Sequence, residues 1–170
     1  MTPEQFKHRV LPLKNKLFRF SMAFLKHEEE ARDVVQDVML KCWEALQTSK
    51  KIDNLEAWCM TLTRNKSLDL IKKKGRNHDE LTQHYELSSS LASPLEQTES
   101  REIMQNLHAL IQALPNQQKT AILLRDVEGN SYKEVADIMK IDINHVKVLI
   151  HRGRTSLRNQ LKSVINYGIN

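Results

Sequence analysis

The side chains best suited to chemistry in this sequence lie between Ser131 and Arg154, where cations alternate with amide, imidazole and small apolar groups. Cations pair with phosphate groups, whereas side-chain donors contact base edges and an apolar group contacts the methyl of thymine. The chemistry that such a set predicts is recognition of nucleic acid. The candidate residues are Lys133, Asn144, His145, Lys147, Val148, His151, Arg152 and Arg154.

Each candidate has a predicted role within that chemistry. Base-edge contacts are assigned to Lys147 and His151, and a thymine methyl contact to Val148. Phosphate contacts are assigned to Lys133, Arg152 and Arg154. Asn144 projects on the same side, and His145 suits either kind of contact or a merely solvated position.

Two helices joined by a tight turn must position these side chains. Ser131 and Glu134 have the spacing of a capping box for the first helix, and Asp142 can cap the second. The inward positions of the second helix recur at helical spacing, at Val146, Ile150, Gly153 and Leu157. A short helix, a turn and a longer helix with a cationic outer face form a helix-turn-helix, whose second helix enters the DNA major groove.

The composition favours helices and an uneven distribution of charge. With four glycines and four prolines among 170 residues, an all-α protein is expected. The net charge of +5 divides into +6 over residues 1–76, −5 over 77–100 and +4 over 101–170. The acidic stretch holds a serine run and a proline and lacks a helical stripe, which is typical of a flexible linker. We therefore predict two small helical domains, at 1–77 and 101–170, joined by an acidic linker at 78–100.

Several functional classes lack their sequence signals. No run of about 18 uncharged apolar residues is present, so no membrane insertion is expected. The first residues lack the pattern of a signal peptide, and a cytoplasmic protein is expected. Cys42 and Cys59 have no metal-ligand spacing and are expected to be buried thiols in a reducing compartment. The histidines are scattered without a nucleophile–base pair, so we predict no enzyme, no metal site and no cofactor.

A helix predicted from Glu28 to Gln47 carries two different faces. One face is an apolar stripe at helical spacing that suits a protein core. The opposite face presents Asp33, Gln36, Asp37 and Leu40. An apolar residue among acids points to a protein partner, although single exposed leucines are ordinary in soluble proteins.

A helix predicted from Leu55 to Lys74 gathers polar and cationic groups on one side and at its end. These groups are Thr61, Arg64, Asn65, Lys72, Lys73 and Arg76. Cations at a helix C-terminus also suit the helix dipole, so a solvated basic end is the alternative interpretation. The combination of hydroxyl and amide groups with cations favours nucleic-acid binding.

Three segments carry a family resemblance. Residues 30–43 resemble the polymerase-binding helix of bacterial sigma factors of the sigma-70 family, and residues 55–72 resemble the helix that melts promoters and reads the minus-ten element. Residues 114–125, with the helix-turn-helix, resemble the domain that reads the minus-thirty-five element. The motifs occur in the family's order, and the short length is similar to the extracytoplasmic-function type, which has sigma-2 and sigma-4 domains alone.

The resemblance implies partners for each surface. Asp33, Gln36, Asp37 and Leu40 would dock on the clamp helices of the largest subunit of core RNA polymerase, whose flap is a further contact. The polar groups of residues 61–76 would meet the minus-ten element, with the 51–56 loop holding a flipped base, and those of residues 133–154 would meet the minus-thirty-five element. The linker would thread through the polymerase cleft. Promoter DNA and an anti-sigma factor are the remaining implied partners.

The chain departs from the family pattern at Asn144, His145, Val148 and Leu149, so the base preference of relatives is not carried over.

Two alternatives compete with the sigma-factor interpretation. A helix-turn-helix regulator that acts without replacing a sigma subunit is one alternative, against which the acidic face of residues 33–37 argues. A scaffold that binds only proteins is the other, and the two basic ends of the chain disfavour it.

Overall fold

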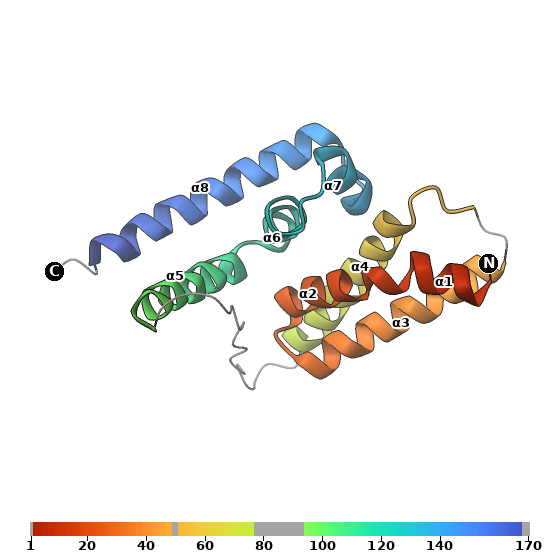
Figure 1. Cartoon of the computed structure of the whole chain (residues 1–170). Helices are drawn as coiled ribbons and strands as arrows, with labels where there is room; N and C mark the ends of the chain where they lie inside the picture. The colour runs from red at the N-terminus through yellow and green to blue at the C-terminus, as the bar shows by residue number, and fades with distance from the viewer. Residues whose placement is uncertain (1, 49–50, 77–93, 168–170) are drawn as a thin grey trace. The chain divides into compact units, whose positions relative to one another are not determined.

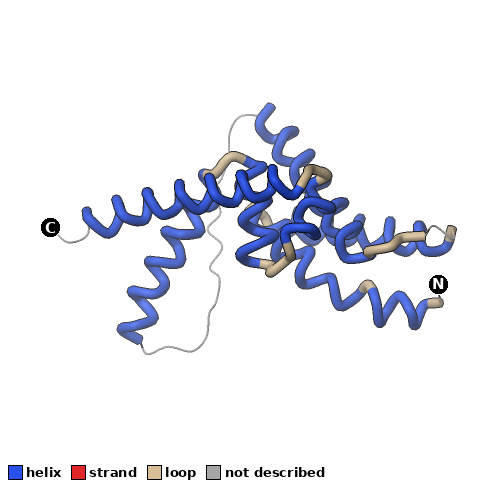
Figure 2. Tube along the Cα trace, turned by 90° about the horizontal axis from the view of Figure 1, so that it is seen from above, coloured by secondary structure: helices blue, strands red, loops and turns tan. Residues whose placement is uncertain are grey.

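The computed structural model describes residues 2–48, 51–76 and 94–167, and every regular element among them is helical (Figures 1 and 2). Contacts divide the chain into two compact units. One is built mainly from the helices before residue 77 and the other mainly from the helices after residue 93. The predicted all-α class is confirmed.

The first unit contains α1 (Pro3–Arg9), the 3-10 turn η1 (Leu11–Leu13), α2 (Lys14–Leu25), α3 (Glu28–Gln47) and α4 (Leu55–Arg76). The 3-10 turn, which contains Pro12, therefore separates α1 from α2. Proline has no N–H to donate and its ring clashes with the preceding turn, so one continuous helix cannot pass through it.

The core of the first unit lies among α2, α3 and α4, which pack against one another. Leu17, Phe20 and Val38 are almost completely buried there. Cys42 and Cys59 are also buried, as expected, and their sulfur atoms lie 3.0 Å apart as free thiols. The apolar stripe of α3 thus faces inward, which leaves its acidic face to solvent.

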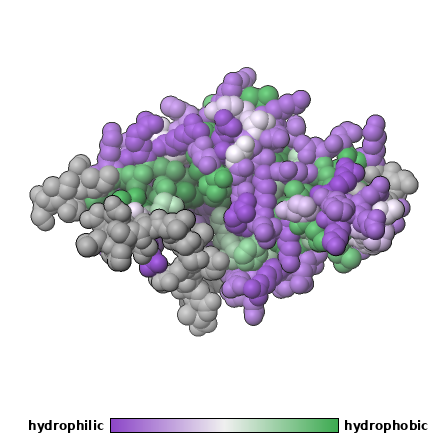
Figure 3. Space-filling model, in the orientation of Figure 1, coloured by the Kyte–Doolittle hydropathy of each residue, from purple (hydrophilic) through white to green (hydrophobic). Residues whose placement is uncertain are grey.

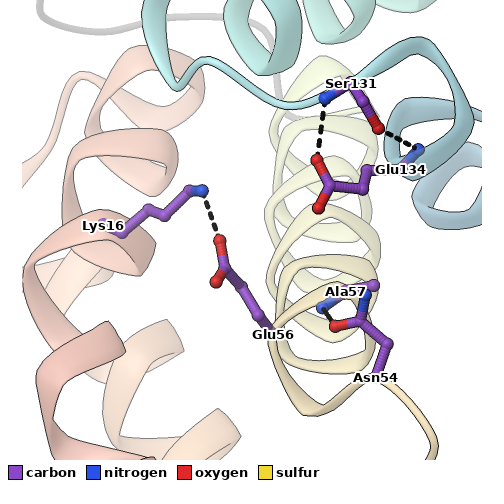
Figure 4. Close-up of polar contacts among 6 residues, drawn as sticks. All are labelled: Lys16, Asn54, Glu56, Ala57, Ser131 and Glu134. Carbon is purple, nitrogen blue, oxygen red and sulfur yellow. Dashed lines mark hydrogen bonds and ion pairs between the residues drawn. The ribbon is translucent and has the colours of Figure 1, made fainter.

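The ends of α3 and α4 are fixed by side chains that accept backbone hydrogen bonds. The observed bounds of α3 are those predicted from the sequence, and His27 caps it because its Nδ1 accepts from the Glu30 N–H at 3.3 Å. Asn54 Oδ1 accepts from the Ala57 N–H at 2.9 Å and starts α4 (Figure 4). Glu56, in the first turn of α4, pairs with Lys16 of α2. These contacts fix where the polar face of α4 begins.

The second unit contains α5 (Pro94–Ala113), α6 (Asn116–Ile122), the π-helical turn η2 (Leu123–Val127), α7 (Tyr132–Met139) and α8 (Ile143–Tyr167). Both α5 and α6 pack against α8. The predicted linker is too long at its C-terminal end, because α5 begins at Pro94, seven residues before Arg101. Proline suits the first position of a helix, where its missing N–H costs nothing. The rest of the predicted linker, 78–93, lies outside the described residues.

The helix-turn-helix is built by the predicted caps. The Ser131 N–H donates to Glu134 Oε2 at 2.7 Å, and the Glu134 N–H donates to Ser131 Oγ at 3.1 Å (Figure 4). The turn after α7 passes through Lys140 at φ 55°, with the Ile141 N–H donating to the Ala136 carbonyl at 3.2 Å. This is the Schellman pattern of a helix end.

The second helix of the motif begins at its own cap. Asp142 Oδ1 accepts from the His145 N–H at 2.8 Å, as the sequence predicts. The four inward positions of α8, from Val146 to Leu157, are all buried. The rotation of α8 about its axis is therefore set by packing, and the remaining side of the helix faces outward.

The surface of the described residues is largely polar. Figure 3 shows hydrophilic side chains over much of the visible face. Within the described ranges, none of the helices combines the length and the apolar composition that crossing a membrane requires. Among the large apolar side chains that do reach solvent are Leu40, Ile103 and Val148.

Candidate nucleic-acid and partner-binding surfaces

The outward face of α3 holds the four predicted partner-binding residues. Asp33, Gln36 and Asp37 are exposed, and Leu40 has 56% of its surface accessible. The neighbouring Val34, Val35 and Val38 of the same helix are buried. Asp37 already has a partner within the first unit, because its Oδ2 forms an ion pair with Lys66 of α4. The remaining surface is an apolar side chain next to carboxylates, which suits a partner with a basic rim around an apolar contact.

The polar face of α4 is held partly by contacts within its own helix. The Thr61 hydroxyl donates to the Ala57 carbonyl at 2.8 Å, and Arg64 Nη1 donates to Asn65 Oδ1 at 3.2 Å. Asn65 is exposed, whereas Arg64 is half-buried. The pair offers a planar cation next to an amide, a combination that suits phosphate and base contacts at once.

The basic end of α4 divides into paired and unpaired cations. Lys74 Nζ lies 2.7 Å from Glu30 Oε2 and ties the end of α4 to α3. Lys72 and Lys73 are exposed and carry no ion pair within the part of the chain that the structure describes. Arg76 is the last residue of α4, and its side chain lies outside the described part.

A hollow of about 310 Å³ lies between the end of α3 and the start of α4. It is lined by Lys41, Glu44, Ala45, Thr48 and Trp58. Trp58 is half-buried, so its ring both covers the core and forms a wall of the hollow. Trp58 is thus neither fully buried in the core nor fully exposed.

The outward face of α8 presents the predicted nucleic-acid set together. Its exposed members are Asn144, His145, Lys147, Val148, His151, Arg152 and Arg154, and Lys133 is exposed on α7. Leu149, which replaces a polar residue of the family pattern, is only 5% exposed and belongs to the core. That departure therefore affects packing and removes a candidate contact from the outward face.

Arg154 has a partner that the sequence interpretation missed. Its Nε and Nη2 donate to the two carboxylate oxygens of Asp126, at 2.9 and 2.5 Å. These hydrogen bonds are the main cause of the raised pKa of Arg154. The bidentate pair joins α8 to η2, so part of this guanidinium is already used within the protein.

Family models match both units. The model described as Sigma-70 region 2 matches residues 10–77, and the model described as Sigma-70, region 4 matches residues 104–157. Together they cover more than two thirds of the chain, in the family's order. The chain belongs to the sigma-70 family. It is a sigma factor, which binds core RNA polymerase and directs initiation at promoters, and this family is not a class of enzymes.

Known sigma factors of the extracytoplasmic-function type are similar over most of the chain. SigW of Bacillus subtilis is 24% identical over 160 residues, which cover 89% of this chain and 86% of that protein. SigE of Mycolicibacterium smegmatis is 26% identical over 149 residues, 86% of this chain but 58% of that protein. This sigma factor therefore spans a little over half the length of SigE and most of the length of SigW.

Solved structures agree with this assignment. The sigma factor RpoE of Bartonella quintana, solved with the anti-sigma factor NepR, aligns with a TM-score of 0.73 and 26% identity. The alignment covers 94% of this sigma factor and 98% of that chain. CnrH, solved with the cytosolic domain of CnrY, aligns with a TM-score of 0.69 over 95% of this chain and 90% of that one, at 22% identity. The second likeness concerns the fold alone.

Proposed function

We propose that this sigma factor binds core RNA polymerase through the outward face of α3. The supporting observation is the exposure of Leu40 beside Asp33 and Asp37 on a helix whose other face is core. Burying the exposed part of an apolar side chain against a partner is favourable. The carboxylates beside it favour a partner whose contact surface is surrounded by basic residues. The clamp helices of the largest polymerase subunit are the proposed partner.

A matched pair of leucine variants tests this contact. Leu11 lies in η1, outside the proposed surface, and is 44% exposed, close to the 56% of Leu40. Burying the exposed half of a leucine contributes about 1–1.5 kcal/mol, so Leu40→Ala should weaken binding to core polymerase roughly tenfold. Leu11→Ala should leave that affinity within twofold. Equal affinities for the two variants, measured by competition with a reference sigma factor, would contradict the proposal.

We propose that α4 contacts the minus-ten element. The proposed contacts are Thr61, Arg64, Asn65, Lys72, Lys73 and Arg76. Two observations support this proposal. Arg64 donates a hydrogen bond to Asn65, which places a cation beside an amide. Lys72 and Lys73 are exposed near the end of the same helix. The 51–56 loop before this helix is proposed to hold a flipped base, whose extrusion costs only a few kcal/mol. Permanganate footprinting of promoter thymines, compared between wild type and Asn65→Ala, measures whether melting depends on this face.

We propose that α8 contacts the minus-thirty-five element. Base edges are assigned to Lys147 and His151, the thymine methyl to Val148, and further contacts to Lys133, Asn144, His145 and Arg152. Arg154 is kept as a weaker phosphate contact because its guanidinium already serves Asp126. Free protein should bind promoter DNA poorly, and holoenzyme should bind it specifically. Tight, specific binding by the isolated chain would instead support a helix-turn-helix regulator that acts without polymerase.

We propose further that this sigma factor is cytoplasmic, performs no catalysis itself and is controlled by an anti-sigma factor. Two similar structures were solved as complexes, one with an anti-sigma factor and one with a cytosolic partner domain. The first domain is proposed to be residues 1–77, and the second to begin with α5 at Pro94. Co-purification of the tagged chain from its host, with and without core polymerase competing, tests for a second protein that displaces polymerase.

A further inference from the structure

Tyr132, the first residue of α7, offers one ring to two cations. The guanidinium carbon of Arg125 lies 4.7 Å from the ring centroid, and Lys147 Nζ lies 5.9 Å from it. Cations within about 6 Å of an aromatic centroid are attracted by the negative face of the ring. Tyr132 itself is half-buried, so the ring forms part of the fixed surface of the second unit.

The ring is anchored by the turn that precedes α7. Arg125 Nη1 donates to the Asn130 carbonyl at 2.9 Å, and the Asn130 N–H donates to the Leu124 carbonyl at 2.9 Å. Gly129 supplies the left-handed conformation of this turn, at φ 75°. Arg125, one of the two cations over the ring, is therefore tied to the backbone of this turn.

Lys147 differs from Arg125 because its ammonium is exposed on α8. A lysine has a flexible four-carbon stem and loses rotamer freedom when it docks on a base edge. A lysine already held against a fixed ring loses less of that freedom on binding DNA. The ring thus favours one orientation of the ammonium before DNA arrives.

We propose that Tyr132 is a positioning residue for promoter recognition, which holds Lys147 in the orientation that reads a base edge of the minus-thirty-five element. The inference rests on the proposed base contact of Lys147. It adds a residue that touches no DNA to the determinants of sequence preference. The ring is the required part of the side chain, because the attraction comes from its face.

The positioning role is tested by run-off transcription with holoenzyme reconstituted from each variant. The templates are a set of promoters, each with one base pair of the minus-thirty-five element changed. Lys147→Ala identifies the base pair that the lysine reads. Tyr132→Leu should reduce discrimination at that same base pair about threefold, the size of an exposed cation–π contact. Tyr132→Phe keeps the ring and should keep discrimination. The double variant Tyr132→Leu with Lys147→Ala should discriminate no less than Lys147→Ala alone.

Lys162→Ala is the matched control, because Lys162 is exposed on the same helix and is outside the proposed DNA contacts. A uniform loss of activity at every promoter in Tyr132→Leu would mean that Tyr132 only supports the fold, and would overturn the positioning role. If Lys147→Ala changes no base preference, the proposed base contact fails and the positioning role fails with it. The two failures are therefore distinguishable.

A measurement on the wild-type protein covers the case in which Tyr132→Leu does not fold. Ring current from Tyr132 should move the ε-methylene proton resonances of Lys147 upfield of those of Lys162 in NMR spectra of the full chain. Coincident resonances for the two lysines would show that Lys147 is not held against the ring and would overturn the proposal.

Discussion

Replacement of Gly153 by alanine should destabilise the second unit through one contact. A Cβ at this position would lie 2.9 Å from Ile122 Cγ1, 3.2 Å from Ile122 Cδ1 and 3.7 Å from Gln118 Cβ. Cγ1 is not the free end of its side chain, and Ile122 is only 2% exposed, so it has little room to turn away. The packing of α6 against α8 at Ile122 therefore depends on the absence of a side chain at Gly153.

The expected change in the free energy of unfolding on Gly153→Ala is the sum of two opposed effects. Forcing a methyl group into a packed contact costs about 1–3 kcal/mol. Replacing glycine by alanine inside a helix stabilises it by about 1 kcal/mol. Gly75, the second-last residue of α4, is the reference site without a clash, because a Cβ there meets no atom within 4 Å. The free energy of unfolding should therefore differ by about 2 kcal/mol between Gly75→Ala and Gly153→Ala, with Gly153→Ala the less stable.

The assay is urea denaturation of the full chain, with hydrogen exchange of peptides from α8 and α4 to assign each change to its unit. Ile122→Ala removes both atoms that crowd the new Cβ, so Gly153→Ala in that background should stabilise instead of destabilise. The reasoning is refuted if Gly153→Ala stabilises as much as Gly75→Ala, or if its cost is the same with and without Ile122.

Three further outcomes are expected. Ser131→Ala removes a capping oxygen and should cost about 1 kcal/mol, seen as faster hydrogen exchange in α7. Arg152→Ala should lower the slope of log affinity against log salt for holoenzyme on promoter DNA by about 0.9, whereas the equally exposed Arg158→Ala should not. The hydrogen bond with Cys42 and burial raise the pKa of Cys59, so its thiol stays protonated at pH 8, whereas the same hydrogen bond lowers the pKa of Cys42. Because both thiols are fully buried, mass spectrometry should find Cys42 and Cys59 alkylated by iodoacetamide only after unfolding.

The elements were predictable wherever local signals agreed with packing. The bounds of α3 follow from an apolar stripe that starts after three glutamates, and both the stripe and the helix dipole favour the same start. The Ser131 and Glu134 box also follows from sequence alone, because its partners are three residues apart. The start of α5 was missed because the first residues after Pro94 are mostly polar and lack the stripe that identifies a helix.

The tertiary partners of the cations proposed to contact DNA were not predictable from the sequence. Asp126 and Arg154 are 28 residues apart, and only the packing of α6 on α8 brings η2 beside the arginine. The contact of Tyr132 with Lys147 likewise depends on the turn between α7 and α8. A helical periodicity gives the side of a helix on which a cation lies, but it carries no information about which acid or ring on another helix meets it.

Because of such ion pairs, the cations of the chain are not all equally available to neutralise phosphates. Lys66 and Lys74 on α4, and Arg154 on α8, each pair with a carboxylate of another helix. Counterion release on DNA depends on cations that neutralise phosphates, and a cation already paired must first give up its acid. Lys72, Lys73 and Arg152 should therefore carry more of the salt dependence than their share of the net charge suggests. The paired cations instead hold neighbouring helices together. Replacing a paired cation should therefore lower the free energy of unfolding, whereas replacing an unpaired one should lower the slope of log affinity against log salt.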